Sequence, residues 1–232
     1  MKIEIYSDVA CPWCYIGKRR FERALAAFSG REGVAVVFRP FQLDPATPTT
    51  ATPLLPRLES KFGPRFRAAA AHTEEVARAE GLTIDHGRAL AVNTLLAHRL
   101  LWLAERERGA EVQRDLAERL FEAYFAKGAD VGDRTRLAAL AADAGMDPGR
   151  VERFLASDEG EAEVRAEIAE ARAMGVDVVP TFVFDETYAV SGAQPTPVFL
   201  QVLEQVARER AASGVLDVQP AADACVDDSC AT

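Results

Sequence analysis

The 232-residue sequence has only four cysteines, no long apolar run and fewer basic than acidic side chains. A helix that spans a bilayer needs about 20 consecutive apolar residues, and no stretch provides them, so we expect no membrane segment. Twenty-seven basic against 36 acidic residues leave a net charge of −9. This charge argues against nucleic-acid or anionic-membrane partners, because both are also negative. The chain opens on a strand-like alternation without an apolar signal region, and we therefore expect a cytoplasmic protein.

The four cysteines form two close pairs, Cys11 with Cys14 and Cys225 with Cys230. Secreted disulfide scaffolds are shorter and richer in cysteine, and a reducing cytosol does not keep such bonds closed. Close pairs in this setting indicate either metal binding or redox chemistry. The composition, 49% hydrophobic and 27% charged, is that of a globular chain.

The first region, residues 1–44, is predicted to be strand, helix, strand. Ile3 and Ile5 alternate with polar neighbours, and 34–38 is a continuous apolar run that suits a strand buried on both faces. Pro12 lies in the first turn of the intervening helix, where its missing N–H is tolerated. This pattern is a βαβ unit with parallel strands.

The middle region, residues 45–175, differs from the first in amino-acid composition. Its first residues, 45–53, are rich in Pro and Thr and predict a linker. The rest is dominated by Ala, Leu, Glu and Arg, which are strong helix formers. Glycines interrupt it at intervals, so we predict six or seven helices and no strand.

Strand character returns at 176–184 and again at 188–190, which predicts an antiparallel hairpin followed by a helix to about residue 212. This element order predicts the α/β class, a thioredoxin-like fold with a large all-helical insertion. Residues 1–44 and 176–212 would form the discontinuous thioredoxin-like domain and 45–175 the helical insertion domain. Residues 213–232 would be a flexible tail that carries the second cysteine pair.

The motif Cys11-Pro12-Trp13-Cys14 lies where the first strand meets the helix. The free N–H groups and the dipole of a helix start stabilise an anion, and a thiolate is the attacking species in disulfide exchange. We therefore expect an exposed, nucleophilic Cys11 and a shielded Cys14 that resolves the mixed disulfide. Trp13, beside Cys11, is a candidate contact for apolar substrate segments, or it simply packs at the helix start.

A zinc site is the alternative, with Cys225 and Cys230 completing four thiolates around the metal. The chain would then be a zinc-stabilised interaction protein. A structural zinc knuckle normally uses tight turns, whereas here a helix begins inside the motif, so the sequence favours redox chemistry and no metal.

Val179-Pro180 is the second indicator. A proline cannot donate to a sheet ladder, so its place in a β-rich run is explained if a strand starts there after a cis Val179–Pro180 bond. The ring would then lie beside the cysteines, and the Val179 backbone would be free to pair with an extended substrate strand.

With these residues the sequence resembles the DsbA family of thioredoxin-fold thiol–disulfide oxidoreductases, most closely its FrnE-like cytosolic branch. The resemblance covers about residues 1–205. Its specific motifs are the Cys-Pro-Trp-Cys segment and the Val-Pro step; supporting segments are Ser7-Asp8, Asn93, 97–99, 120–125 and 190–194.

The resemblance implies that Cys11 is the nucleophile, Cys14 the resolving thiol and Pro180 the cis-proline. It implies no cofactor, protein disulfide or dithiol substrates, and a cellular thiol as reductant. Many relatives bury an acid six residues before the first cysteine, where this chain has Ile5. Water, Asp8 or His98 would then move the proton, and the sequence does not choose among them.

Two further points stay open at this stage. We hypothesise that Cys225 and Cys230 form a second redox pair that assists the first, although an inert tail is the alternative. Folds of this kind also include glutathione-dependent isomerases and transferases of small molecules, which use a serine where Cys11 stands. The sequence therefore favours a protein disulfide oxidoreductase or isomerase.

Overall fold

The computed structural model describes residues 1–212. Four strands form one sheet in the order β2-β1-β5-β6, with bounds β1 (Lys2–Ser7), β2 (Ala35–Pro40), β5 (Thr181–Phe184) and β6 (Tyr188–Ser191). Strand β2 is parallel to β1, β5 is antiparallel to β1, and β6 is antiparallel to β5. The predicted βαβ unit and the predicted hairpin are confirmed.

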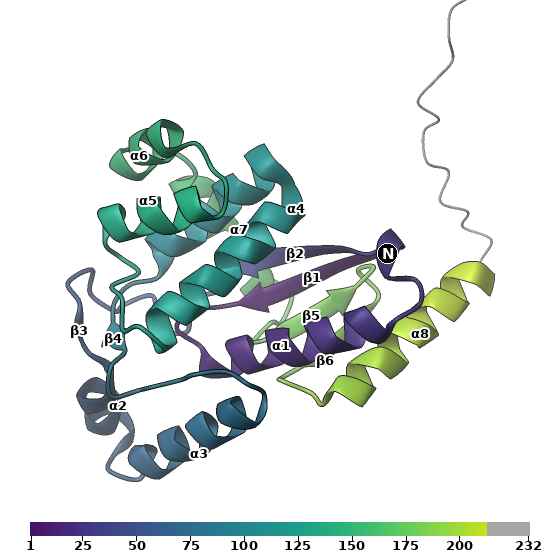
Figure 1. Ribbon diagram of the computed structural model, residues 1–232, viewed down its shortest axis with the longest axis horizontal. Helices are drawn as coiled ribbons and strands as arrows, with labels where there is room; N and C mark the ends of the chain where they lie inside the picture. The colour runs from purple at the N-terminus through teal and green to yellow at the C-terminus, as the bar shows by residue number, and fades with distance from the viewer. Residues whose placement is uncertain (213–232) are drawn as a thin grey trace, which may run out of the picture.

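Helices α1 (Pro12–Ala27) and α8 (Thr196–Ala212) lie side by side against one face of this sheet (Figure 1). A single 3₁₀ turn, η1 (Arg31–Gly33), leads from α1 into β2. The helices between β2 and β5 are α2 (Leu54–Phe62), α3 (Phe66–Ala79), α4 (Leu95–Phe125), α5 (Arg134–Asp143), α6 (Pro148–Ala156) and α7 (Glu161–Ala173).

The alternation of β1 gives the sheet two unlike faces. Ile3 and Ile5 are 0% and 2% exposed on the face that α1 and α8 cover. On this face the Phe21 ring of α1 lies 5.3 Å from that of Phe182 and 5.6 Å from that of Phe199. Contacts of this kind bury the largest side chains and are the main source of stability.

The helical insertion differs from its prediction in two places. Thr52–Pro53 and Leu90–Ala91 pair as the short strands β3 and β4, so the expectation of no strand here is wrong. Two residues a strand are too few for an alternation pattern to be visible in the sequence. Helix α4 is interrupted at Gly109, whose φ of 83° is left-handed, which confirms the break predicted at that glycine.

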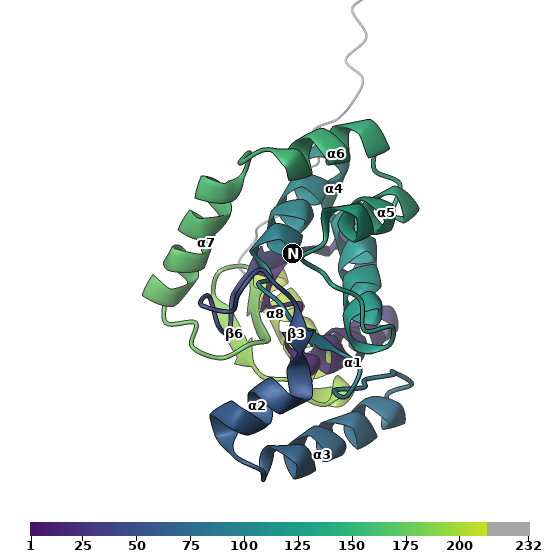
Figure 2. The same ribbon diagram turned by 90° about the vertical axis from the view of Figure 1, so that its left-hand side faces the viewer.

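The insertion is attached to the sheet through α4, which covers the β2 edge (Figure 2). The Gln113 amide accepts from the Phe38 N–H at 2.8 Å and donates to the Phe38 carbonyl at 3.0 Å. An unpaired strand edge invites pairing with other chains, and here a side chain satisfies it. The insertion and the sheet also share one hydrophobic core, and the predicted domain boundaries stay predictions.

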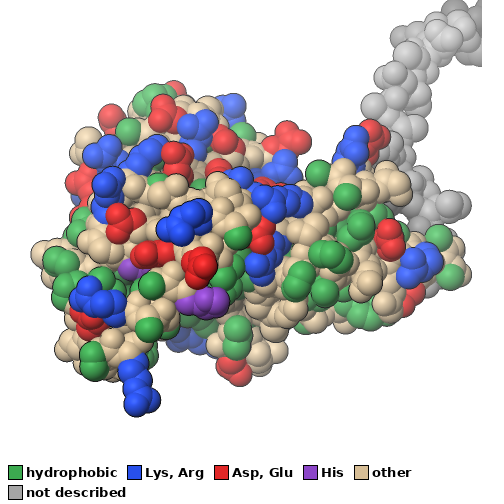
Figure 3. Space-filling view, turned by 60° about the horizontal axis from the view of Figure 1, so that its bottom comes forward, with side chains coloured by type: hydrophobic (Ala, Val, Ile, Leu, Met, Phe, Trp, Pro, Cys, Tyr) green, Lys and Arg blue, Asp and Glu red, His purple; other side chains and the backbone are tan. Residues whose placement is uncertain are grey.

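Charged side chains of the insertion are interspersed in sign on its surface (Figure 3). Arg150 illustrates the pattern, with ion pairs to Glu107 at 2.8 Å and Glu159 at 2.5 Å. Within residues 1–212 no helix is long and apolar enough to cross a membrane.

Candidate active site

The Cys11–Cys14 motif opens α1 as the sequence predicts. Cys11 is the last residue before the helix, with an extended backbone (φ −93°, ψ 113°), and Pro12 is the first helical residue. The Cys11 carbonyl accepts from the N–H groups of Cys14 at 3.1 Å and Tyr15 at 3.4 Å. The helix thus begins inside the motif, and its free N–H end is at Cys11.

Both cysteines are free thiols and both are buried, at 4% exposure for Cys11 and 2% for Cys14. The expectation of an exposed Cys11 is wrong. The segment before β5 packs against it, and the Cys11 thiol donates to the Val179 carbonyl at an Sγ–O distance of 3.7 Å. Sequence periodicity places Cys11 at a helix start but carries no information about a segment 168 residues away. Trp13 is 36% exposed.

The environment of Cys14 keeps its thiol protonated. Burial raises the pKa of Cys14 well above the usual value, and the hydrogen bond and charge of Cys11 raise it further. Hydrogen bonds from the Ser7 side chain and the Asp8 backbone only partly oppose this rise in pKa. Removing the Cys14 proton is therefore a distinct requirement of any reaction in which this sulfur attacks.

The Val179–Pro180 bond is cis, as the sequence predicts. Hydrogen bonds fix both sides of this step: the Thr181 hydroxyl donates to the Val178 carbonyl, and the Gly192 N–H donates to the Pro180 carbonyl, each at 2.7 Å. No hydrogen bond of the Val179 N–H is found within the described residues.

Gly17 explains how α1 and the proline come so close. A Cβ at this position would lie 2.8 Å from Cγ of Pro180 and 3.3 Å from Cα of Ala193. Both distances are shorter than normal van der Waals contact, so only glycine allows the present packing of the helix against the proline loop.

Asp8 and His98 lie behind the motif and contact each other. The Asp8 Oδ1 is 3.3 Å from the His98 Nε2, and each side chain is 3% exposed. The second Asp8 carboxylate oxygen accepts from the Leu43 N–H at 2.8 Å, and the Asp8 carbonyl accepts from the Cys11 N–H at 3.0 Å. Asp8 thus joins the motif to α4, while no contact of its carboxylate with either sulfur is found in residues 1–212.

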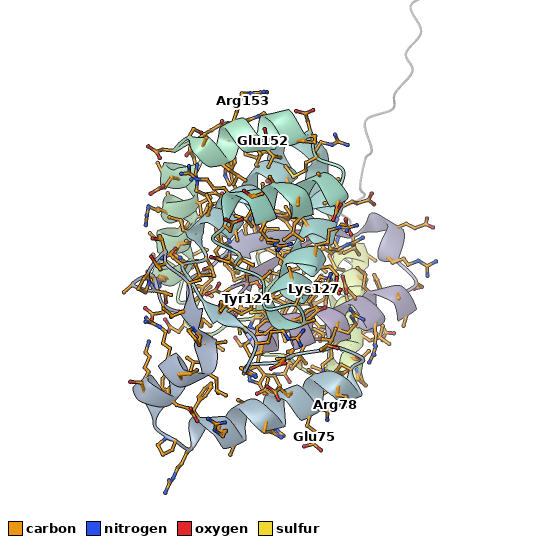
Figure 4. The ribbon with its side chains drawn as sticks, turned by 60° about the vertical axis from the view of Figure 1, so that its left-hand side comes forward. Glu75, Arg78, Tyr124, Lys127, Glu152 and Arg153 are labelled. Carbon is orange, nitrogen blue, oxygen red and sulfur yellow. The ribbon has the colours of Figure 1, made fainter. Side chains whose placement is uncertain are left out.

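Tyr124, from the segment 120–125, also belongs to this region. Its side chain is 0% exposed, and its hydroxyl has no hydrogen-bond partner within the described residues. Burial raises its pKa, and the Asp8 charge adds to the increase. Figure 4 shows the side chain in the interior, between α1 and the insertion helices.

Four exposed apolar side chains belong to segments at or beside the motif: Trp13 at 36%, Leu43 at 53%, Met174 at 59% and Val178 at 55% exposure. The carbonyl of Gln42, the residue before Leu43, accepts a hydrogen bond from the Arg172 guanidinium at 2.9 Å. This bond ties the Leu43 segment to the end of α7. Apolar side chains that stay exposed around a reactive group are typical of a binding surface. Only Trp13 was anticipated from the sequence.

The alternative of a metal centre has no geometric support in the part of the chain that is described. Within residues 1–212 no group of three or more His, Cys, Asp and Glu side chains could hold a metal ion. The predicted second pair, Cys225 and Cys230, lies outside the described residues, as does the rest of the predicted tail.

Comparison with known proteins agrees with this geometry. The family model of the DSBA-like thioredoxin domain matches residues 2–204. The chain belongs to this family. The resemblance to the DsbA family and the thioredoxin-like fold class are thereby confirmed.

Solved structures extend the comparison. A probable DsbA oxidoreductase from Streptomyces coelicolor is 41% identical, with a TM-score of 0.82 over 100% of this chain and 99% of that one. The cytosolic disulfide reductase DsbM from Pseudomonas aeruginosa, also solved with glutathione, is 20% identical, with a TM-score of 0.63 over 90% and 100% of the two chains. A 2-hydroxychromene-2-carboxylate isomerase is 15% identical, with a TM-score of 0.66 over 92% and 100%. The last two show a shared fold alone.

Proposed function

We propose that this member of the DsbA-like family is a cytosolic oxidoreductase or isomerase of protein disulfides, with Cys11 as nucleophile and Cys14 as resolving thiol. The observation that carries the proposal is the position of Cys11, at the free N–H end of α1 and 3.7 Å from the Val179 carbonyl. A sulfur at a helix start is favoured as a thiolate, and the neighbouring backbone offers a place for the substrate strand.

The reaction proceeds through a mixed disulfide. The Cys11 thiolate attacks one sulfur of the substrate disulfide, and the other substrate sulfur leaves as a thiolate that takes up a proton. Cys14, after losing its proton, attacks Cys11 and releases the second substrate thiol. The substrate disulfide gains two electrons, and the Cys11–Cys14 pair becomes a disulfide. A thiol reductant restores the dithiol, and the reverse sequence oxidises a substrate dithiol.

Two features support a protein as the substrate, and a third holds the nucleophile in place. The Val179 N–H is unused within the described residues, so an extended peptide can pair with it. The exposed Trp13 and Val178 flank this point and suit apolar segments of an unfolded chain. Pro12 starts the helix that holds Cys11 in place. Water, Asp8 and His98 stay candidates for moving the Cys14 proton.

The test is reduction of insulin with dithiothreitol as the terminal reductant. Cys11→Ser is expected to lower the rate to that of dithiothreitol alone, because the serine hydroxyl does not replace the thiolate. Cys14→Ser is expected to accumulate the mixed disulfide, visible by mass spectrometry, because the resolving thiol is gone. Catalysis that survives Cys11→Ser intact refutes the assignment.

A glutathione-dependent isomerase or transferase is the second candidate, since the chain shares its fold with an isomerase and with a reductase solved with glutathione. The cysteine at position 11 favours thiol–disulfide exchange over that chemistry. A glutathione titration followed by calorimetry separates the two: an isomerase would bind glutathione in both the native chain and Cys11→Ser. Metal analysis of the purified protein tests the zinc-stabilised alternative.

A further inference from the structure

The sheet face opposite α1 and α8 carries a groove of about 950 Å³. All four strands form its floor, and α7 forms one wall. The segment 174–178, which leads directly into the Val179–Pro180 step, forms another wall. The groove therefore begins within one residue of the backbone that contacts the Cys11 thiol.

The groove is strongly acidic. Its only basic lining residue among those described, Arg39, is already paired with Glu4 at 2.7 Å and Glu167 at 3.8 Å. Three more carboxylates line it without an ion-pair partner among residues 1–212: Glu170, Asp177 and Glu186. An uncompensated cluster of one sign raises the local concentration of oppositely charged ligands.

The negative charges around the groove affect the carboxyl group of Glu167, which lies on the α7 wall. Burial raises the pKa of Glu167, and the negative charges of Glu105 and Glu170 add to the increase, while Arg39 opposes it. A cation in the groove would relieve this repulsion, because an opposite charge nearby favours the ionised carboxylate.

Tyr6 adds a polar group to the floor of the groove. Its side chain is only 7% exposed and lines the groove floor from β1. Its hydroxyl has no hydrogen-bond partner within the described residues. Among the described residues only the Tyr124 hydroxyl is both fully enclosed and unpaired, so the Tyr6 hydroxyl reaches the groove, where a ligand can pair with it. A phenolic oxygen can accept from a guanidinium or ammonium and donate to a peptide carbonyl.

We propose that the groove binds a Lys- or Arg-bearing segment of the same protein whose disulfide reacts at Cys11, an inference that rests on the proposed function. A substrate strand that pairs with Val179 continues past Val178 and Asp177 into the groove. Arginine suits the site best, since its fork of N–H donors matches carboxylates in pairs. The groove thus selects disulfides that have basic residues near them in the chain.

Binding is tested with two fluorescent peptides that lack cysteine and differ only in three Arg residues replaced by Gln. Fluorescence anisotropy with the full chain is expected to show tighter binding of the Arg peptide. The triple variant Glu170→Gln, Asp177→Asn, Glu186→Gln is expected to raise the Kd for this peptide about tenfold, because each lost surface pair contributes modestly. Tyr6→Phe is expected to raise it about threefold, through one lost hydrogen bond.

The matched control is Glu75→Gln, Glu111→Gln, Glu152→Gln, which changes the net charge equally at exposed positions outside the groove. Figure 4 shows Glu75 and Glu152 on α3 and α6, at opposite ends of the view. The control is expected to leave the Kd unchanged. Equal binding of the Arg and Gln peptides, or equal effects of the two triple variants, overturns the proposal.

A second experiment, with reactive disulfide substrates, separates this inference from the proposed function. The same peptides carrying a disulfide are compared with a small neutral disulfide. We expect a higher kcat/KM for the Arg peptide, lost in the groove variant, and no change for the neutral disulfide. No turnover of any disulfide refutes the proposed function, whereas turnover without preference for the Arg peptide overturns the role of the groove.

Discussion

The two faces of the sheet are built from neighbouring residues of the same strands, yet they differ in every physical respect. On the covered face, Ile3 and Ile5 of β1 are buried in the same hydrophobic core as the aromatic rings of α1 and α8. On the other face, Glu4 and Tyr6 of β1 line an acidic groove. Since side chains alternate along a strand, one segment supplies stability with one set of residues and a binding surface with the other.

The comparison shows which face of the sheet serves stability and which face can contact a ligand. The covered face is packed around Phe182, whose ring centroid lies 4.5 Å from that of Phe199. The open face keeps charged groups next to the Val179–Pro180 step. Substitutions on the first face should therefore act on stability, and those on the second on recognition.

The largest effect is expected for Phe182→Ala on the covered face. Removing this fully buried ring leaves a cavity between Phe21 and Phe199, and such losses cost about 3–5 kcal/mol of unfolding free energy. The matched variant is Val183→Ala, the next residue of β5, which lines the groove and is half-buried. It should cost about 1 kcal/mol. Urea unfolding measures both, and equal losses would contradict the division into two faces.

An intermediate effect is expected for Glu118→Gln, which removes one partner of a buried cation on α1. The Lys18 ammonium of α1, with a side chain 3% exposed, pairs with Glu22 at 2.8 Å and Glu118 at 2.5 Å. Removing one partner of this buried cation should cost about 2 kcal/mol at pH 7, measured by urea unfolding.

The pH dependence of this loss follows from the Glu118 carboxyl. Burial opposes the shift, but Lys18 and Arg19 lower its pKa overall below the usual 4.5. Its contribution is therefore present above about pH 4.5 and lost as the pH falls through the lowered pKa of the folded state. The cost of Glu118→Gln should shrink over the same range. A cost that stays constant down to pH 3 would exclude the charge as its origin.

The smallest effect is expected for Glu167→Gln in the groove. A raised pKa means that ionising this carboxylate disfavours the folded state, so its penalty is absent below about pH 4.5 and grows as the pH rises through the folded pKa. The variant should gain a few tenths of a kcal/mol at pH 7, discounted for the half-exposed side chain, and nothing at pH 4. Glu111→Gln is the control, and a loss at pH 7 would show that the pair with Arg39 outweighs the repulsion.

Much of the fold was predictable because it rests on local patterns. The alternation at Ile3 and Ile5, the proline after Cys11 and the β-rich run around Pro180 predicted the strands, the first helix and the cis bond. The β3–β4 pair was missed because two residues form no pattern. The exposure of Cys11 was mispredicted because the Val179 segment that covers it is distant in the chain.

The candidate site shows the same division. Cys11, Cys14 and Pro180 carry a recognisable motif, and the sequence alone named them. The Asp8–His98 contact, the unpaired Tyr124 hydroxyl and the role of Gly17 have no local signature, because each depends on a partner from another element.

The sequence by itself determined the family and the order of the main-sheet strands and their helices, and it predicted redox chemistry for the Cys11–Cys14 pair, because these follow from short-range periodicity, helix-start preferences and a compact motif. Only the tertiary structure decided which sheet face is closed and which is open, how the thiols are buried and where unpaired carboxylates gather. Those outcomes depend on packing between segments that are far apart in the chain, and no local pattern of residues records that packing.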